Sequence, residues 1–226
     1  MQARTITNQT GKALMFTVAA MMMFILSFML FEPTVSRAQV NNTFTVKQTI
    51  TAEISFLATS SAVTMAGNIA GITGGNATAT TQVVVQTNSA GGYNMTLAFS
   101  NTPAMRGDAT GNVGIVNYGT TSIPTYNFFA SSSAVFAYRV TASTTTDVAQ
   151  AFLNNGTTCN TGSLSTANNC WMGPSTTAMV IINRGVAATT SATTTLQFRV
   201  NVPNNPTPAL QSDTYTATAT LTATAQ

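Results

Sequence analysis

The chain has 226 residues, of which only 6% are charged and none is histidine. The commonest general base and the commonest metal ligand are therefore missing, and the sequence predicts neither an enzyme nor a bound metal or cofactor. Three of the eight basic side chains precede residue 39. The remainder has no basic patch, which argues against a nucleic-acid partner.

The N-terminus has the layout of an export signal. Arg4 and Lys12 are followed by an apolar run over 13–31, and Ser36 and Ala38 then stand at the −3 and −1 positions of a cut before Gln39. This order predicts a signal peptide over 1–38 and one domain over 39–226. The apolar run is also long enough to span a bilayer, so an uncleaved membrane anchor is the alternative. Either way we expect the domain at the cell surface or outside the cell.

The first predicted strand is long, from Thr45 to Phe56. Apolar side chains at Val46, Ile50 and Ile54 alternate with polar ones, including Lys47 and Glu53. A period of two is typical of a strand with one apolar face.

A hairpin is predicted next, from strands at 77–87 and 93–99. The connection over 88–92 contains two glycines, which suit a tight turn. Shorter strands are predicted at 113–118, 126–130 and 134–141. The stretch 147–153 fits either a helical turn or a short strand.

Two cysteines, Cys159 and Cys170, are the only ones in the chain. In an exported protein such a pair predicts a disulfide. A redox-active pair would more commonly be spaced Cys-x-x-Cys, so we expect a structural bridge that closes an Asn- and Gly-rich loop.

Strands are predicted at 178–183 and 193–202, and prolines over 203–208 end the second of them. In the closing run, threonine occupies every even position from Thr214 to Thr224, and the odd positions carry Tyr215, Leu221 and alanines. We expect one unbroken strand with a hydroxyl face and an apolar face. Nine strands without a further helix predict an all-β fold, a single antiparallel Ig-like β-sandwich; a closed barrel is the alternative.

Three loop features suggest binding. Arg106-Gly107-Asp108 falls in the predicted loop 100–112 and resembles the integrin-binding tripeptide of adhesion proteins, although Gly-Asp is also common in turns. Asp108 with Asn112 would supply part of a Ca²⁺ site, which needs further oxygen ligands. Aromatic residues of loops, Tyr118, Tyr126 and Trp171, would suit a carbohydrate if they are exposed and would otherwise belong to the core.

The closing run from Ala209 to Gln226 resembles the last strand of spore-coat-protein-U-like and fimbrial secreted domains. The segment Thr87-Asn-Ser-Ala-Gly-Gly-Tyr93-Asn-Met-Thr-Leu97 is similar to hairpins of bacterial surface sandwiches. The resemblance implies an Ig-like sandwich in a bacterial envelope or extracellular fibre, and it carries over no functional residues.

From these observations we expect an exported structural or adhesive surface protein. Its partners would be copies of itself or other envelope proteins, with residues 39–56 donated as a strand to a neighbour. Contact with a membrane is expected only through the N-terminal segment, if it is not cleaved. The alternative is an extracellular carbohydrate-binding module.

Overall fold

The computed structural model describes residues 6–30, 41–109, 113–119, 122–129 and 131–226. The chain divides into two units, with the boundary between Thr49 and Ile50. In the first unit, α1 spans Ile6–Leu30. Its stretch Gly11–Leu30 has a mean hydropathy of 2.3 and is long and apolar enough to cross a membrane, a property that a signal sequence shares. The predicted cut after Ala38 lies outside the described residues.

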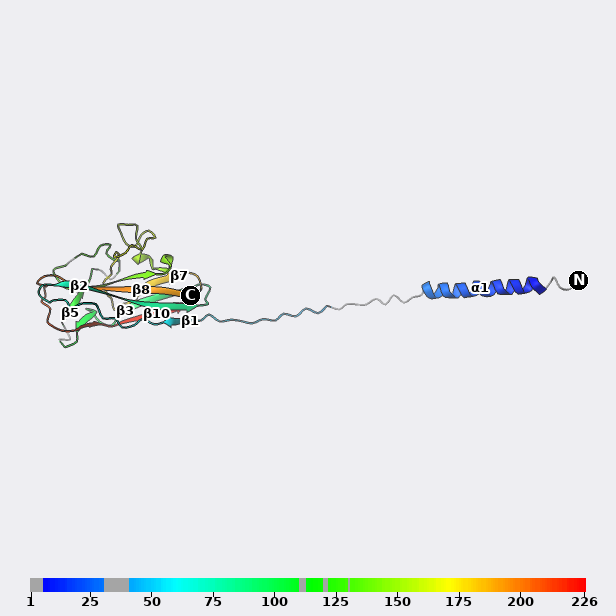
Figure 1. The fold of residues 1–226 in the computed structure, drawn as a ribbon, viewed down its shortest axis with the longest axis horizontal. Coiled ribbons are helices and arrows are strands. Elements are labelled where there is room, and N and C mark those ends of the chain that lie inside the picture. The colour runs from blue at the N-terminus through cyan, green and yellow to red at the C-terminus, as the bar shows by residue number, and fades with distance from the viewer. Residues whose placement is uncertain (1–5, 31–40, 110–112, 120–121, 130) are drawn as a thin grey trace. The chain divides into compact units, whose positions relative to one another are not determined.

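The second unit is mainly β. Its described strands are β1 Ile54–Ala58, β2 Gly75–Thr87, β3 Tyr93–Phe99, β4 Met105–Gly107, β5 Gly114–Asn117, β6 Val135–Ala142, β7 Met179–Arg184, β8 Ala188–Val202, β9 Tyr215–Ala217 and β10 Ala219–Ala225. Two short 3-10 helices, η1 Thr145–Asp147 and η2 Gln150–Phe152, occupy the stretch that the sequence left undecided. Figure 1 shows β2 and β8 running side by side along this unit.

The strands form two sheets. The larger follows the order β1-β2-β8-β6-β5-β4-β9 and the smaller β10-β3-β7. The larger sheet curls into a half-barrel. Neighbouring strands are antiparallel except β5 and β6, which pair in parallel. The mainly-β prediction is therefore confirmed, while the expectation of a purely antiparallel arrangement is wrong.

The main core contains residues of both sheets. Val83 of β2 and Leu196 of β8 belong to the same buried cluster as Tyr93 and Met95 of β3, and each of these side chains is at most 1% exposed. Buried and less buried residues alternate along β3 and over most of β8, as the period-two pattern predicts. Apolar burial between the sheets is the main stabilising term of such a fold.

The predicted hairpin is not formed. Strand β2 pairs with β1 and β8, whereas β3 pairs with β7 and β10 in the other sheet. The connection over 88–92 carries the chain across the core instead of turning it back along the same sheet. Alternation shows which side chains of a strand are buried, but it does not show the strand's partner. Two strands in opposite sheets that face each other across a core have the same pattern as two hydrogen-bonded neighbours in one sheet.

The first strand is shorter than predicted. Residues 41–53 have no regular secondary structure, and β1 begins only at Ile54. Alternation favours an extended chain, but a strand also needs a partner, and β2 ends at Thr87 opposite Ile54. The predicted strand at 126–130 is likewise absent over 126–129; residue 130 is not described.

The closing run is interrupted at Thr218. Strand β9 pairs with β4 in the larger sheet, and β10 pairs with β3 in the smaller one. The segment from β3 to β4 also passes from the smaller sheet to the larger one, and the closing run pairs with it antiparallel along its length. At the point where both segments change sheet, the Ser100 N–H donates to the Thr218 carbonyl at 3.0 Å. The predicted faces are correct, because the threonines from Thr214 to Thr224 are exposed while most of the odd positions are half-buried.

Candidate functional site: the segment before the first strand and the edge beside it

The segment before β1 exposes large apolar side chains. Phe44 is 83% exposed, and Val46 and Ile50 are each 82% exposed. They occupy even positions of a stretch without regular structure, so an extended conformation places them on one face. Large apolar side chains in such a row usually mark an interaction surface.

Strand β1 continues this apolar character at the edge of the larger sheet. It pairs with β2 on one side, and no other described strand pairs with its opposite edge. Phe56 is 37% and Leu57 53% exposed, while Ile54 is half-buried against the main core. Strand β1 lies next to β10, an edge strand of the smaller sheet. Unpaired edges of this kind accept further strands.

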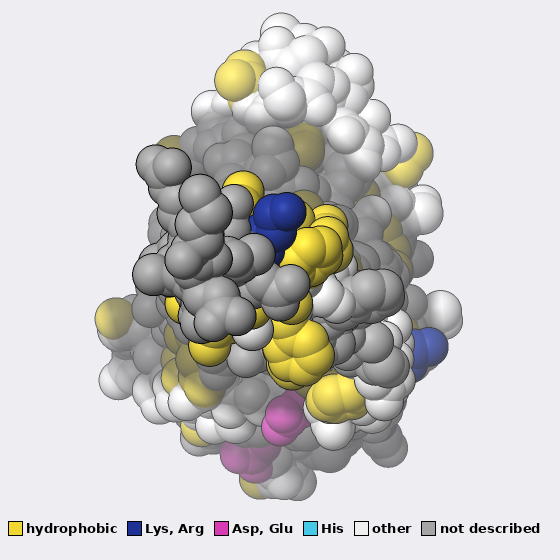
Figure 2. All heavy atoms as spheres, turned by 90° about the vertical axis from the view of Figure 1, so that its right-hand side faces the viewer, with side chains coloured by type: hydrophobic (Ala, Val, Ile, Leu, Met, Phe, Trp, Pro, Cys, Tyr) yellow, Lys and Arg dark blue, Asp and Glu magenta, His cyan; other side chains and the backbone are white. Residues whose placement is uncertain are grey.

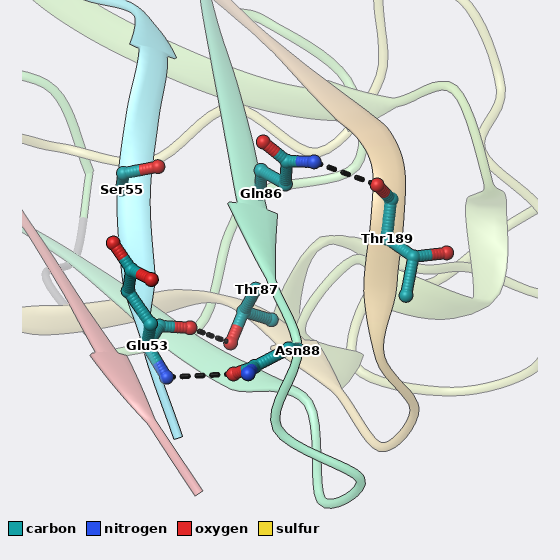
Figure 3. Close-up of a pocket in the computed structure, with 6 residues that line it drawn as sticks. All are labelled: Glu53, Ser55, Gln86, Thr87, Asn88 and Thr189. Atoms are coloured by element: carbon teal, nitrogen blue, oxygen red, sulfur yellow. Dashed lines mark hydrogen bonds between the residues drawn. The ribbon is translucent and has the colours of Figure 1, made fainter. Parts of the chain in front are cut away.

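Asn88 anchors the chain where it joins the sheet. Its side-chain Oδ1 accepts a hydrogen bond from the Glu53 N–H at 2.6 Å, and its Nδ2 donates to the Thr51 carbonyl at 3.1 Å. The hydroxyl of Thr87 donates to the Glu53 carbonyl at 2.6 Å. These bonds replace ladder hydrogen bonds beyond the end of β2, so the chain is held from Thr51 onward. Figure 3 shows the two bonds that involve Glu53.

An open hollow of about 240 Å³ lies at the same place. It is lined by Glu53, Ser55, Gln86, Thr87, Asn88 and Thr189. Figure 3 shows these polar side chains around the start of β1, with Gln86 donating to the Thr189 carbonyl at 2.7 Å. Glu53 is exposed and is the one carboxylate of this lining. The hollow offers hydrogen bonds to a polar group but no paired acid and base.

Charged side chains make up only 6% of the chain. Figure 2 shows one face on which basic and acidic side chains are few beside apolar and uncharged polar atoms. No group of three or more metal-binding side chains occurs in the part of the chain that the structure describes. Asn112, the second residue of the predicted partial Ca²⁺ site, lies outside the described residues.

Arg106-Gly107-Asp108 is not a loop tip. Arg106 and Gly107 belong to β4, and the Asp108 N–H donates to the Thr214 carbonyl at 2.8 Å. The Arg106 guanidinium donates to the Thr102 and Pro103 carbonyls at 2.7 and 3.2 Å. Asp108 is exposed and Gly107 is buried. The loop placement was wrong because β9 supplies a distant partner strand; the adhesive role stays a prediction.

Two of the three candidate sugar-binding aromatics are buried. Trp171 is 1% and Tyr118 6% exposed, whereas Tyr126 is half-buried. Trp171 and Tyr118 form a second apolar cluster with Val135 and Ala137 of β6. Their role is packing, which the sequence had kept open as the alternative.

The disulfide is present between Cys159 and Cys170. Both cysteines are buried, and the bridge closes the loop that leads into Trp171. Its place beside the second cluster supports the structural role expected from the sequence.

Comparison with known proteins adds no relative to this picture. No protein-family model matches the chain, and a search of curated proteins finds no similar sequence. The function must therefore be inferred from the geometry.

Proposed function

We propose that this protein is an exported structural or adhesive protein of the cell surface, and that it assembles by pairing the segment before β1 with a second copy. The observation that carries the proposal is the row formed by Phe44, Val46 and Ile50, each more than 80% exposed. A strand with one apolar face is stable only when that face is covered and its backbone is paired.

The proposed architecture of the second unit is an Ig-like β-sandwich in a bacterial envelope layer or fibre. Two sheets that share one core support it, and so does the passage of the closing run from one sheet to the other. The apolar helix α1, compatible with a signal sequence, and the disulfide support export. The low surface charge favours close packing of copies.

The competing proposal, a carbohydrate-binding module, depended on exposed aromatic side chains. Trp171 and Tyr118 are unavailable to a sugar because they lie in the second cluster. We therefore retain the assembly function alone.

Matched substitutions test the assembly. Phe44→Asp and Ile50→Asp place a charge on the apolar face, whereas Thr45→Asp and Thr49→Asp place the same charge on the opposite face. The full chain, purified in a non-ionic detergent, is examined by sedimentation velocity and negative-stain microscopy. We expect the first pair to abolish oligomers or fibres and the second pair to leave them. Assembly that tolerates Phe44→Asp and Ile50→Asp, or a wild-type chain that stays monomeric at high concentration, would contradict the proposal.

A further inference from the structure

Two arginines lie close together on the outer face of the larger sheet. Arg139 of β6 is in register with Gln197 of β8, and Ala137 of β6 with Arg199 of β8. Residues directly opposite share a face, and so do residues two apart along a strand. Arg139 and Arg199 are thus diagonal neighbours, at a typical separation of about 7–8 Å. Ala137, directly opposite Arg199 on this face, belongs to the second cluster around Trp171.

The guanidinium of Arg199 is held against aromatic rings. Its Cζ lies 4.2 Å from the ring centroid of Phe128 and 5.8 Å from that of Trp171. A ring over the flat face of a guanidinium leaves the N–H donors in its plane free to bind an acceptor. The buried Nε of Arg199 has no acceptor among the described residues.

Arg139 is the more unusual of the two because it is only 6% exposed. Its Nε–H is also buried, again without an acceptor in the described part of the chain. Burial lowers the pKa of the Arg139 guanidinium from its usual value. Arginine nevertheless keeps its charge in proteins. Among the described residues, the ion pair is between Asp147 and Arg184. It therefore does not neutralise the charge of Arg139.

The disulfide loop helps to hold the aromatic rings of this site in place. Thr125 and Trp171 exchange backbone hydrogen bonds at 2.8 and 3.0 Å, and the Cys170 N–H donates to the Tyr126 carbonyl at 3.1 Å. The side chain of Asn169 donates to the same carbonyl at 3.0 Å. The segment with Phe128 is thereby fastened to the loop that ends at Trp171, and the donors of Arg199 are preorganised.

We propose that Arg139 and Arg199 form a binding site for a small oxyanion, a carboxylate or a sulfate. An anion between the two guanidinium groups would relieve their mutual repulsion and accept the unpaired Nε–H donors. An oxyanion is favoured over a halide because two oxygens match the fork of a guanidinium. The ligand is small because Arg139 is almost sealed from solvent. The site is independent of the segment proposed for assembly.

The test uses Trp171, the only tryptophan of the chain, as a reporter. The full chain in a non-ionic detergent and a Tris-chloride buffer is titrated with sodium acetate or with sodium sulfate, at constant ionic strength. We expect a saturable change in tryptophan fluorescence and a saturable rise in Tm. The anion that saturates at the lower concentration distinguishes a carboxylate site from a sulfate site.

Arg139→Met should abolish both responses. The control Arg106→Met should keep them, because the Arg106 guanidinium is already bonded to the Thr102 and Pro103 carbonyls. Sulfate also stabilises proteins generally by exclusion from their surface, so the difference between wild type and Arg139→Met is the decisive quantity. Equal responses in these two proteins would overturn the proposal.

A second variant keeps the test valid if Arg139→Met does not fold. Arg199→Lys retains the positive charge but loses the planar fork and the stacking on Phe128. We expect it to bind the preferred anion at least tenfold more weakly. Binding as tight as in the wild type would likewise overturn the proposal.

Discussion

At the scale of single residues, Gly92 shows how closely the connection from β2 to β3 approaches β7. Its φ is +75°, and an added Cβ would lie only 2.0 Å from the Arg184 carbonyl oxygen. Gly156 has a similar φ of +96°, but nothing lies within 4 Å of an added Cβ. Substitutions at these two glycines therefore distinguish the energetic cost of the backbone conformation from that of a steric clash.

We expect Gly92→Ala to lower the free energy of unfolding by more than about 2 kcal/mol, since the left-handed backbone costs about 1–2 kcal/mol and the clash adds to it. Gly156→Ala should cost only the backbone term. Urea denaturation followed by circular dichroism measures both. Equal losses would show that the contact with Arg184 is relieved at no cost.

A partly buried ion pair lies beside the same strands. Arg184 Nη1 donates to Asp147 Oδ2 at 2.5 Å, with the two side chains 16% and 9% exposed. Arg184 also donates to the carbonyls of Val186 and Ala187 at 3.0 and 3.1 Å. It ties η1 to β7 across 37 residues of sequence.

Removing one partner leaves the other charge largely buried, which is the costly case for such pairs. We expect Asp147→Asn to destabilise the fold by about 2–3 kcal/mol, reduced from the usual range because carbonyls still hold Arg184. A double-mutant cycle with Arg184→Gln should give a coupling energy of about 2 kcal/mol. Additive losses would mean that the pair contributes no interaction of its own.

At the scale of elements, the disulfide loop is a prediction of the sequence that the structure confirms. The two cysteines are 11 positions apart, and closing a loop of that size restricts the unfolded chain. The double substitution Cys159→Ser, Cys170→Ser should therefore lower the free energy of unfolding by about 2–3 kcal/mol. Denaturation of wild type and variant in parallel measures this, with reductant added to the wild type as a second route to the same state. An unchanged midpoint in both would contradict it.

The strands show why pattern and pairing differ. Alternation correctly placed the buried face of β3 and of most of β8, because period two follows from the geometry of one strand. It did not reveal that β2 and β3 belong to different sheets, or that β4 exists, because those facts depend on distant partners. Residues 44–50 have the pattern of a strand but no regular secondary structure, and the assembly proposal rests on this difference.

At the scale of the whole molecule, the core makes stability sensitive to alkaline pH. Burial raises the pKa of Tyr93 and Tyr138 above the ordinary value of 10.0. The folded protein thus keeps these phenols protonated at a pH where the unfolded chain has lost the protons. The free energy of unfolding is unaffected by them below about pH 9 and falls as pH rises above about 10.

Tyr138→Phe should reduce this fall, because the titrating group is removed from the core. The substitution also removes the hydrogen bond from the Tyr138 hydroxyl to the Met172 sulfur at 3.1 Å. That loss lowers the free energy of unfolding by the same amount at every pH. Tyr126→Phe, at a half-buried position, serves as the control. Urea denaturation at several values between pH 8 and 12 gives the slopes. A slope in Tyr138→Phe equal to that of the wild type would contradict the prediction.

The two functional proposals differ in how far the sequence could predict them. The exposed row at Phe44, Val46 and Ile50 could be predicted in part, because the sequence shows both the alternating pattern and the position of the row after the export signal. The pair Arg139 and Arg199 could not, since 60 positions separate them and only the register of β6 with β8 makes them neighbours. The available signals differ: Arg199 stands at a polar position of an alternating strand, whereas Arg139 interrupts an apolar run.

By itself the sequence determined the apolar N-terminal helix, the mainly-β character, the disulfide and the buried face of β3 and of most of β8. Each of these follows from local composition or from the geometry of a single extended chain. Only the tertiary structure decided which strands pair, where the closing run changes sheet and which charges are buried together. Those outcomes depend on contacts between residues far apart in the chain, and a periodic pattern is the same whichever partner covers it.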